Sequence, residues 1–430
     1  MSKRRAELEE ESQKETAVWK DEDDDDLTIA VPQKVKKTFK VDLKRITDED
    51  DKELDSKQYI GRLQEAFRRR HGGVPKWAQK IEENHDEDSL LTSAAGYIEK
   101  DAKLPKTTIK TTLLKDFNIG RRKKHSINAL KFHKMRPVLI TADSSGTVQL
   151  YKVGLEARQD HFLQSAQFGK FPIDCMEIAQ TGHAVICSSS LQEYLMQYNM
   201  ETTKVTQLRL PKSVPKGGIS KFNISYDSEF LAIAGQNSHV YILQATTMEH
   251  IKTISLPSNA KTIKFFPGVT REIWIQCENG QIVMADILAT SQHTFADEGT
   301  IHGTCMAISN SGDYFATGND TGIVNVYDGA TCRNTENPAP LFHVDNLVTA
   351  ISSIAISSDA QYMAIASDVK DNQIRLVHMQ SQTTFKNFPD RFGKVSKAKC
   401  VDISPRGGFV AVGNGDGKLH LFNIHHFSDY

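Results

Sequence analysis

Short apolar runs alternate with turn-forming residues along most of the chain after about residue 126. The stretch SGDYFATGNDTGIVNVYD (311–328) shows the unit, in which two apolar runs are joined by Asn-Asp-Thr-Gly. Runs of this length with Gly, Asn, Asp and Ser between them are typical of β-hairpins. The pattern recurs at 137–153, 184–200, 230–245, 272–287, 311–328, 362–379 and 409–424, each time after another apolar run. We therefore expect an all-β domain made from one repeated unit.

The repeat length predicts the architecture. Residues 126–430 number 305, or about 44 per copy, which is within the roughly 40–45 residues of a WD40-type blade. Alternate residues of GIVNVYD (322–328) point to opposite faces, and both sets are mainly apolar. Stacked blades bury both faces in this way, whereas a sheet with one solvated face would show a full polar set. A seven-bladed WD40-like β-propeller is predicted; two packed sandwiches would not explain one period held seven times.

The copies depart from the regular WD pattern, and the last one is incomplete. None ends in Trp-Asp, and the His-and-Asp polar bracket is complete in no copy, although Asp320 lies where the turn Asp would be. Packing must then hold the blades together. The seventh copy ends after its third strand, and the β-branched segment TTIKTTLLKDF (107–117) is expected to supply the outer strand and close the ring. The propeller is accordingly assigned to 106–430.

Charge is concentrated before the repeats. Residues 1–125 hold 28 Lys+Arg and 27 Asp+Glu, which is 55 of the 107 charges of the chain. Such a segment cannot bury enough apolar surface to offset its ordering entropy. We expect residues 1–105 to be a largely disordered extension with one short amphipathic helix at about 56–71.

Several extension residues are candidates for partner docking. Tyr59, Leu63 and Phe67 share one face of the predicted helix, while Trp19 and Trp77 lie outside it. The acidic run at 21–26 does not fit a calcium-binding EF-hand loop, because Asp26 stands where that loop needs Gly. A solvated acidic run is the simpler interpretation.

Two basic segments are candidates for contact with RNA or for nuclear import. The simpler interpretation of each is a solvated, charged linker or loop. Dense Lys and Arg neutralise phosphates or serve in nuclear import. The candidates are Arg121, Arg122, Lys123 and Lys124 ahead of the first repeat, and Lys386, Arg391, Lys394, Lys397 and Lys399 between the sixth and seventh.

Motifs for catalysis, metals and membranes are not found. GNGDGK (413–418) lacks the Ser or Thr and the helix of a phosphate-binding loop, so it is expected to be a turn. The six cysteines are widely spaced with no CxxC pair, which favours a reducing compartment and thiols used as core residues. The first residues lack the apolar region of a signal peptide, and no apolar run approaches about 18 residues. We expect no enzyme activity, no cofactor, no metal and no membrane partner.

Features outside the hairpins resemble one family. These are DEGTIHGT (297–304), DNLVTAISSIAIS (345–357), IASDVKDNQIRLVH (365–378), FKNFP (385–389) and, in the extension, AVWKDEDDDD and YIGRLQEAFRRRHGGVPKWA. Together they resemble the U3 small nucleolar RNA-associated protein 18 family over most of residues 17–430. Generic WD propellers share only the hairpins, so the resemblance is specific.

The resemblance implies a function that periodicity alone does not indicate. It implies a non-catalytic scaffold subunit of the small-subunit processome, in its UtpB subcomplex, that acts in pre-rRNA processing and small ribosomal subunit biogenesis in the nucleolus. The implied partners are other UtpB WD-repeat proteins, the U3 ribonucleoprotein and pre-rRNA. Some family members also carry a motif that docks the helicase of the nuclear exosome; Phe39, Val41 and Asp42 fit it, whereas Thr38 replaces its Leu.

Two alternatives stay open. A WD adaptor of another class, such as a substrate receptor of a ubiquitin ligase, would usually show Trp-Asp-x-Arg at strand ends, and this chain does not. A propeller hydrolase would need carboxylates or histidines that converge on the central channel.

Overall fold

The fold was analysed in a computed structural model. It describes residues 28–30, 53–55, 58–61, 63–65, 104–114, 118, 124–154, 161–179, 182–289, 291–389, 395–427 and 430. The chain divides into two units, Met1–Asp101 and Ala102–Tyr430. In the described part of the first unit, β1 (Thr28–Ala30) pairs antiparallel with β2 (Glu53–Asp55). Residues 58–61 and 63–65 are helical, as the predicted amphipathic helix requires.

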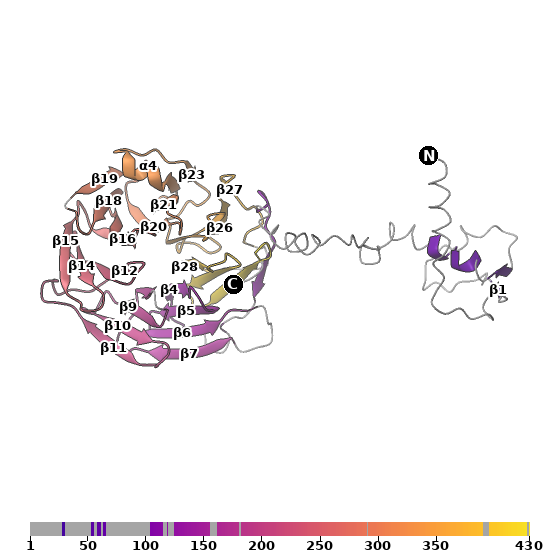
Figure 1. The fold of residues 1–430 in the computed structure, drawn as a ribbon, viewed down its shortest axis with the longest axis horizontal. Helices are drawn as coiled ribbons and strands as arrows, with labels where there is room; N and C mark the ends of the chain where they lie inside the picture. Colours follow the sequence, from indigo (N-terminus) through magenta and orange to yellow (C-terminus); the bar gives the residue numbers. More distant parts are fainter. Residues whose placement is uncertain are drawn as a thin grey trace, which may run out of the picture. The chain divides into compact units, whose positions relative to one another are not determined.

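The second unit is a ring of seven four-stranded antiparallel sheets, which confirms the predicted propeller (Figure 1). From the centre outward, the first four blades consist of β4 (Ile127–Phe132), β5 (Val138–Asp143), β6 (Thr147–Lys152) and β7 (Phe162–Gln167); β8 (Cys175–Ile178), β9 (Ala184–Ser188), β10 (Tyr194–Asn199) and β11 (Val205–Arg209); β12 (Phe222–Ile224), β13 (Phe230–Ala234), β14 (His239–Gln244) and β15 (His250–Ser255); and β16 (Ala260–Phe265), β17 (Glu272–Cys277), β18 (Gln281–Asp286) and β19 (Gln292–Ala296). The last three consist of β20 (Gly303–Ile308), β21 (Tyr314–Asn319), β22 (Val324–Asp328) and β23 (Phe342–Val344); β24 (Ser353–Ile356), β25 (Tyr362–Ala366), β26 (Ile374–His378) and β27 (Thr383–Thr384); and β28 (Ala398–Ile403), β29 (Phe409–Asn414), β30 (Leu419–Ile424) and β3 (Thr111–Leu114).

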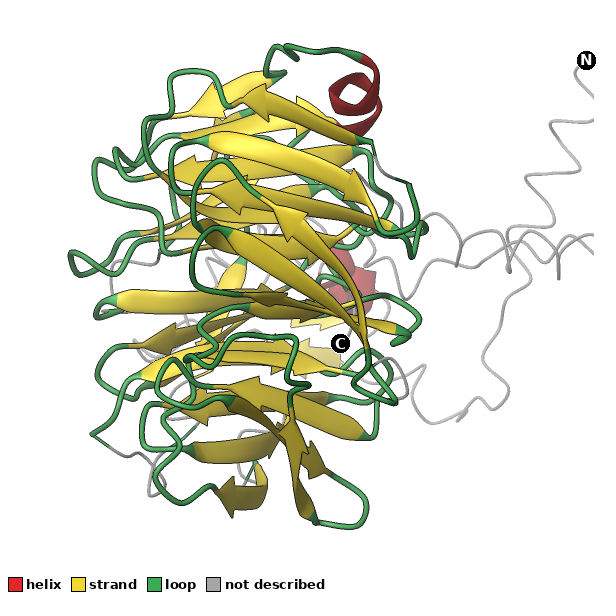
Figure 2. Ribbon diagram, turned by 90° about the vertical axis from the view of Figure 1, so that its left-hand side faces the viewer, coloured by secondary structure: helices red, strands yellow, loops and turns green. Residues whose placement is uncertain are grey.

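The seven hairpins found in the sequence are the two middle strands of the seven blades. In the fifth blade, for example, Tyr314 pairs with Asp328 and Gly318 with Val324. The segment GNGDGK is the turn between β29 and β30, as expected. Figure 2 shows the sheets from the side, with the short helix α4 (Gly329–Asn334) at the top edge. Asp328 caps this helix: its carboxylate accepts a hydrogen bond from the Thr331 N–H and so satisfies one free donor of the first turn.

Apolar packing between neighbouring blades forms the core. The described buried residues form seven hydrophobic clusters, and each cluster joins the facing sides of two adjacent blades. Trp274, Phe315 and Tyr327 are fully buried in the cluster between the fourth and fifth blades. Because every sheet is covered on both faces, its two middle strands are apolar on both sides, which is why the seven hairpins show no polar alternation.

Polar bracing is also present in the fifth blade. The Asp297 carboxylate accepts hydrogen bonds from the Tyr327 hydroxyl at 2.6 Å and from the Asn325 amide at 2.9 Å. These contacts join the connection that enters the blade to its third strand. No copy has the complete His-and-Asp bracket of regular WD repeats in its sequence. In this blade the buried contacts of Asp297 take the place of that bracket.

The ring is closed by a segment that precedes the first blade. β3 pairs antiparallel with β30, so that the outer strand of the seventh blade lies more than 300 residues before its neighbour, within the 107–117 segment identified in the sequence. Residues 104–110 continue this segment along the sixth blade, where the Ile109 backbone and the Asn387 side chain exchange two hydrogen bonds. Leu104 and Ile109 are buried in the cluster between the sixth and seventh blades. We call residues 104–114 the closing strap.

Candidate functional site: the central channel

The innermost strands of all seven blades surround a central channel with a volume of about 840 Å³. The penultimate residue of each of these strands occupies an equivalent place, and five of the seven are polar. These seven channel-ring residues are Lys131, Glu177, Asn223, Lys264, Ala307, Ala355 and Asp402, and all of them except the buried Asn223 line the channel. Ionisable groups therefore do converge on the channel, which the sequence analysis did not foresee.

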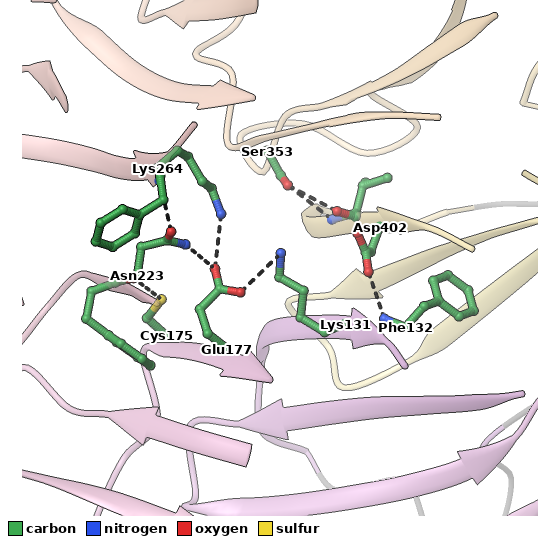
Figure 3. A network of polar contacts seen from close by, with 11 residues as sticks. Lys131, Phe132, Cys175, Glu177, Asn223, Lys264, Ser353 and Asp402 are labelled. Carbon is green, nitrogen blue, oxygen red and sulfur yellow. Dashed lines mark hydrogen bonds and ion pairs between the residues drawn. The ribbon is translucent and has the colours of Figure 1, made fainter. Parts of the chain in front are cut away.

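Glu177 is the centre of this network (Figure 3). One carboxylate oxygen lies 3.0 Å from the Lys264 ammonium and accepts a hydrogen bond of 3.0 Å from the Asn223 amide. The other oxygen lies 3.6 Å from the Lys131 ammonium. The carbonyl oxygen of the Asn223 side chain in turn accepts from the Phe265 N–H. Four consecutive blades, the first to the fourth, are linked through one carboxylate.

The electrostatic balance keeps these groups charged. Burial alone would raise the pKa of Glu177, but the charges of Lys131 and Lys264, with the hydrogen bonds from Lys264 and Asn223, outweigh it and lower the pKa to about 2. Glu177 in turn raises the pKa of Lys131, against the opposing effect of burial. The Glu177 side chain is 15% exposed, so the channel desolvates it only in part.

Asp402 joins the last blade to the first. Its carboxylate accepts a hydrogen bond of 2.7 Å from the Phe132 N–H. Burial raises its pKa above the usual value even though Lys131 and this hydrogen bond favour the ionised form. Beside it, Ser353 of the sixth blade accepts from the Val401 N–H at 3.2 Å, as Figure 3 shows.

Three cysteines share a second equivalent place, two residues before the channel ring. Cys175, Cys305 and Cys400 each direct the thiol at a backbone carbonyl of the next blade, on Phe222, Ile351 and Ile127 respectively. Thr262 makes the same contact with Thr304 through its hydroxyl. With the contacts of Glu177, Asn223, Asp402 and Ser353, every junction between neighbouring blades has a polar link beside the channel.

This arrangement suits bracing better than catalysis. Both oxygens of Glu177 are already paired, and its low pKa makes it a poor general base near neutral pH. No group of three or more His, Cys, Asp or Glu placed to hold a metal ion occurs among the residues that the structure describes. In the same part of the chain no helix is long and apolar enough to span a membrane.

The thiols are expected to be unreactive in the folded protein. Burial raises the pKa of Cys305, Cys332 and Cys400 to about 12. Three units above the ordinary value leave roughly a thousandfold less thiolate at pH 8. Mass spectrometry after brief iodoacetamide treatment should find the half-buried Cys175 on the channel wall labelled first. Unfolding in urea should expose all six thiols, and equal labelling of Cys175 and Cys400 in native protein would contradict the expectation.

Among the described residues of the two predicted basic segments, Lys124 lies just before the first blade, and Lys397 and Lys399 lie at the start of the seventh. The Lys399 ammonium and the Ser126 hydroxyl both bind the Asn128 side-chain oxygen, at 2.8 and 2.7 Å. Lys124 and Lys397 are exposed beside them. Lys386 is exposed further along, after β27, whereas Arg121, Arg122, Lys123, Arg391 and Lys394 lie outside the described residues.

The other candidates belong to the first unit. Tyr59 is half-buried and Leu63 is exposed on the short helix. Trp19, Phe39, Val41, Asp42, Phe67 and Trp77 lie outside the described residues. Docking through these side chains stays a prediction.

Comparison with known proteins identifies close relatives. The family model "WD domain, G-beta repeat" matches residues 289–328, which include most of the fifth blade. The chain is 66% identical to the U3 small nucleolar RNA-associated protein 18 homolog of Caenorhabditis elegans over 97% of this chain and 98% of the relative. Homologs of the same name from Mus musculus and Homo sapiens are 29% and 28% identical, over 97% and 96% of this chain and 76% and 75% of their own lengths. The similarity therefore extends over both units.

Proposed function

Because this chain belongs to the U3 small nucleolar RNA-associated protein 18 family, we propose that it is a non-catalytic scaffold of the small-subunit processome. In this proposal it is a UtpB subunit that acts in the nucleolus, in pre-rRNA processing and small ribosomal subunit biogenesis. The observation that carries the proposal is the 66% identity to a protein named for its association with U3 small nucleolar RNA, over nearly the whole of both chains.

The geometry of the channel supports a scaffold. The ionisable groups that an enzyme would use for chemistry are occupied by contacts between blades, as Glu177 illustrates. What the propeller offers is a large rigid rim of loops and outer strands, and such surfaces bind partners without any catalytic group. The partners proposed are the other WD-repeat subunits of UtpB, the U3 ribonucleoprotein and pre-rRNA.

RNA contact is proposed at the junction of the first and seventh blades. Lys124 and Lys397 are exposed there beside Lys399. Lysines clustered on one surface attract phosphate and release counterions when they bind it. The extension is proposed to reach neighbouring subunits, and Phe39, Val41 and Asp42 to dock the exosome helicase.

Particle association tests this function. Tagged protein should sediment with very large pre-ribosomal particles and recover U3 RNA, and depletion should leave unprocessed small-subunit precursor. Glu177→Gln should restore processing in proportion to the folded protein present, because the carboxylate braces and does not react. Failure to recover either particles or U3 RNA would refute the assignment, and a rescue defect of a hundredfold or more per folded molecule would favour an enzyme.

A further inference from the structure

The loops on one face of the fifth and sixth blades form a continuous surface. These are the blade-to-blade connections 297–302 and 345–352 and the hairpin turns 320–323 and 367–373. The Asp320 N–H donates to the His302 carbonyl at 3.2 Å, and the hydroxyls of Thr349 and Ser367 are 2.7 Å apart. Each loop therefore touches the next, from the fourth blade to the sixth.

This surface is acidic, and its described part holds few cations. Its exposed carboxylates are Glu298, Asp320, Asp345, Asp368 and Asp371. Within the described residues none of the five makes an ion pair, and Lys370 is the one lysine or arginine in these loops. Carboxylates gathered with so few cations repel one another, and a cationic partner would relieve that repulsion.

Apolar side chains project from the same loops. Ile301, Val348 and Val369 are 72%, 77% and 49% exposed. The backbone beneath Val348 is held firmly, because its neighbours Leu347 and Thr349 are buried and Gly322 packs against the Leu347 carbonyl with no room for a Cβ. The side chain is thus presented by an ordered loop. We call these eight residues, the five carboxylates and the three apolar side chains, the acidic-apolar sector.

We propose that the acidic-apolar sector binds a protein segment rich in Lys or Arg that carries aliphatic side chains. Lysine or arginine would pair with the carboxylates at the rim of the contact, and aliphatic groups would cover Ile301, Val348 and Val369. Charged rims give such contacts specificity and fast association, while apolar burial gives the attraction that salt does not screen.

The charge distribution argues against RNA as the occupant. Exposed lysines on the same face are more numerous around the seventh, first and second blades, namely Lys124, Lys170, Lys212, Lys216, Lys397 and Lys418. Lys397 is the one of these nearest the sector, because Val395 in its connection exchanges two hydrogen bonds with Asn372. Phosphate would be repelled by the acidic-apolar sector and attracted to these lysines. The proposed contact is independent of the proposed function, so either can fail without the other.

Binding of defined probes to the full-length chain tests the proposal. The probes are a 16-residue labelled peptide of alternating Lys and Leu, the same peptide with Ser for Leu, and labelled oligo(U) RNA, each followed by fluorescence anisotropy at two salt concentrations. The Lys-Leu peptide should bind most tightly. Asp320→Asn combined with Asp368→Asn should weaken its binding about tenfold, and Val348→Ser should weaken it about threefold.

Matched variants on the opposite face of the propeller show whether peptide binding requires the acidic-apolar sector or only the negative charge of the protein. Asp313→Asn with Asp359→Asn makes the same change in exposed loops of the same two blades, and Leu341→Ser matches the apolar change. These controls should leave peptide affinity within about twofold. Equal losses in the sector variants and the controls, or equal binding of both peptides, would overturn the proposal, as would oligo(U) binding that the sector variants abolish.

Discussion

The Glu177→Gln variant is expected to lose about 2–3 kcal/mol of unfolding free energy at pH 7. Glutamine keeps the shape but removes the charge that lies between Lys131 and Lys264, at 3.6 and 3.0 Å. Two ammonium groups would then face each other beside the channel with only a neutral amide between them. We place the loss below that of a fully buried pair because Lys131 and Lys264 keep 32% and 28% of their side-chain surface exposed.

A surface pair provides the matched control. Glu201 also has two basic neighbours, the His183 ring at 2.7 Å and the Arg136 guanidinium at 3.9 Å, but its side chain is 50% exposed. Glu201→Gln should therefore cost less than about 1 kcal/mol. Denaturant titration measures both variants, and similar losses would mean that the channel network is no stronger than an ordinary surface pair.

The pH dependence of the difference identifies its origin. The pKa of Glu177 is lowered from 4.5 to about 2, so its stabilising contribution is complete above pH 4.5 and is lost as the pH falls towards 2. The stability gap between the native protein and Glu177→Gln should close over that interval. Asp402 has a raised pKa and acts in the opposite direction. Burial is the main cause and is the same in both proteins, but the Glu177 charge also contributes, so Asp402 adds a smaller, opposing change to the difference. A gap that stays constant down to pH 3 would show that packing, and not charge, is responsible.

Removal of the closing strap should open the propeller. A chain that begins at residue 102 keeps Leu104, Ile109 and β3, whereas one that begins at residue 115 loses all of them. The longer chain should unfold cooperatively within a few degrees of the full-length protein. The shorter one exposes the edge of β30 and part of the cluster between the sixth and seventh blades, and should lose more than about 5 kcal/mol or aggregate.

Point variants in the full-length chain test how much the closing strap stabilises the propeller without removing it. Ile109 is 1% exposed, so Ile109→Ala should cost about 3 kcal/mol. Ile60 on the short helix is 51% exposed, and Ile60→Ala should change stability by no more than about 0.5 kcal/mol. Thermal unfolding and limited proteolysis report both changes. A truncation at residue 115 that unfolds at the same temperature as the full-length chain would show that the ring does not depend on this strap.

Periodicity predicted the propeller because hairpin signals are local. Turn residues such as Asn319 and Gly322 and the apolar runs around them act over a few positions, so a single sequence contains them. The channel network was not predicted, because each of its members lies on a different blade, more than 40 residues from the next, and is a polar residue in an apolar run, as Glu177 is in CMEIA. The apolar run before each hairpin forms the innermost strand of a blade. Aligning these seven runs on their last residues would have placed Lys131, Glu177, Asn223, Lys264 and Asp402 at one common position. The distances between these side chains, and which of them pair, depend on the closed ring.

The acidic-apolar sector was not predicted from the sequence for a similar reason. Asp320, Val348 and Asp368 stand in three loops that are separated in the sequence, and none of those loops is unusual by itself. Circular stacking places them next to one another. Asn128 likewise joins Lys399, 271 residues later in the chain, to Ser126 ahead of the first blade.

The closing strap also determines when the fold can be completed during synthesis. Thr112 bonds to His425, 313 residues later, and every pairing of β3 waits for the final strand to leave the ribosome. At about 5–20 residues per second, the strap is exposed for roughly 15 to 60 s before its partner exists. During that time Leu113 and Leu114 are unprotected strand residues, and an unfinished ring exposes a strand edge that another chain can pair with.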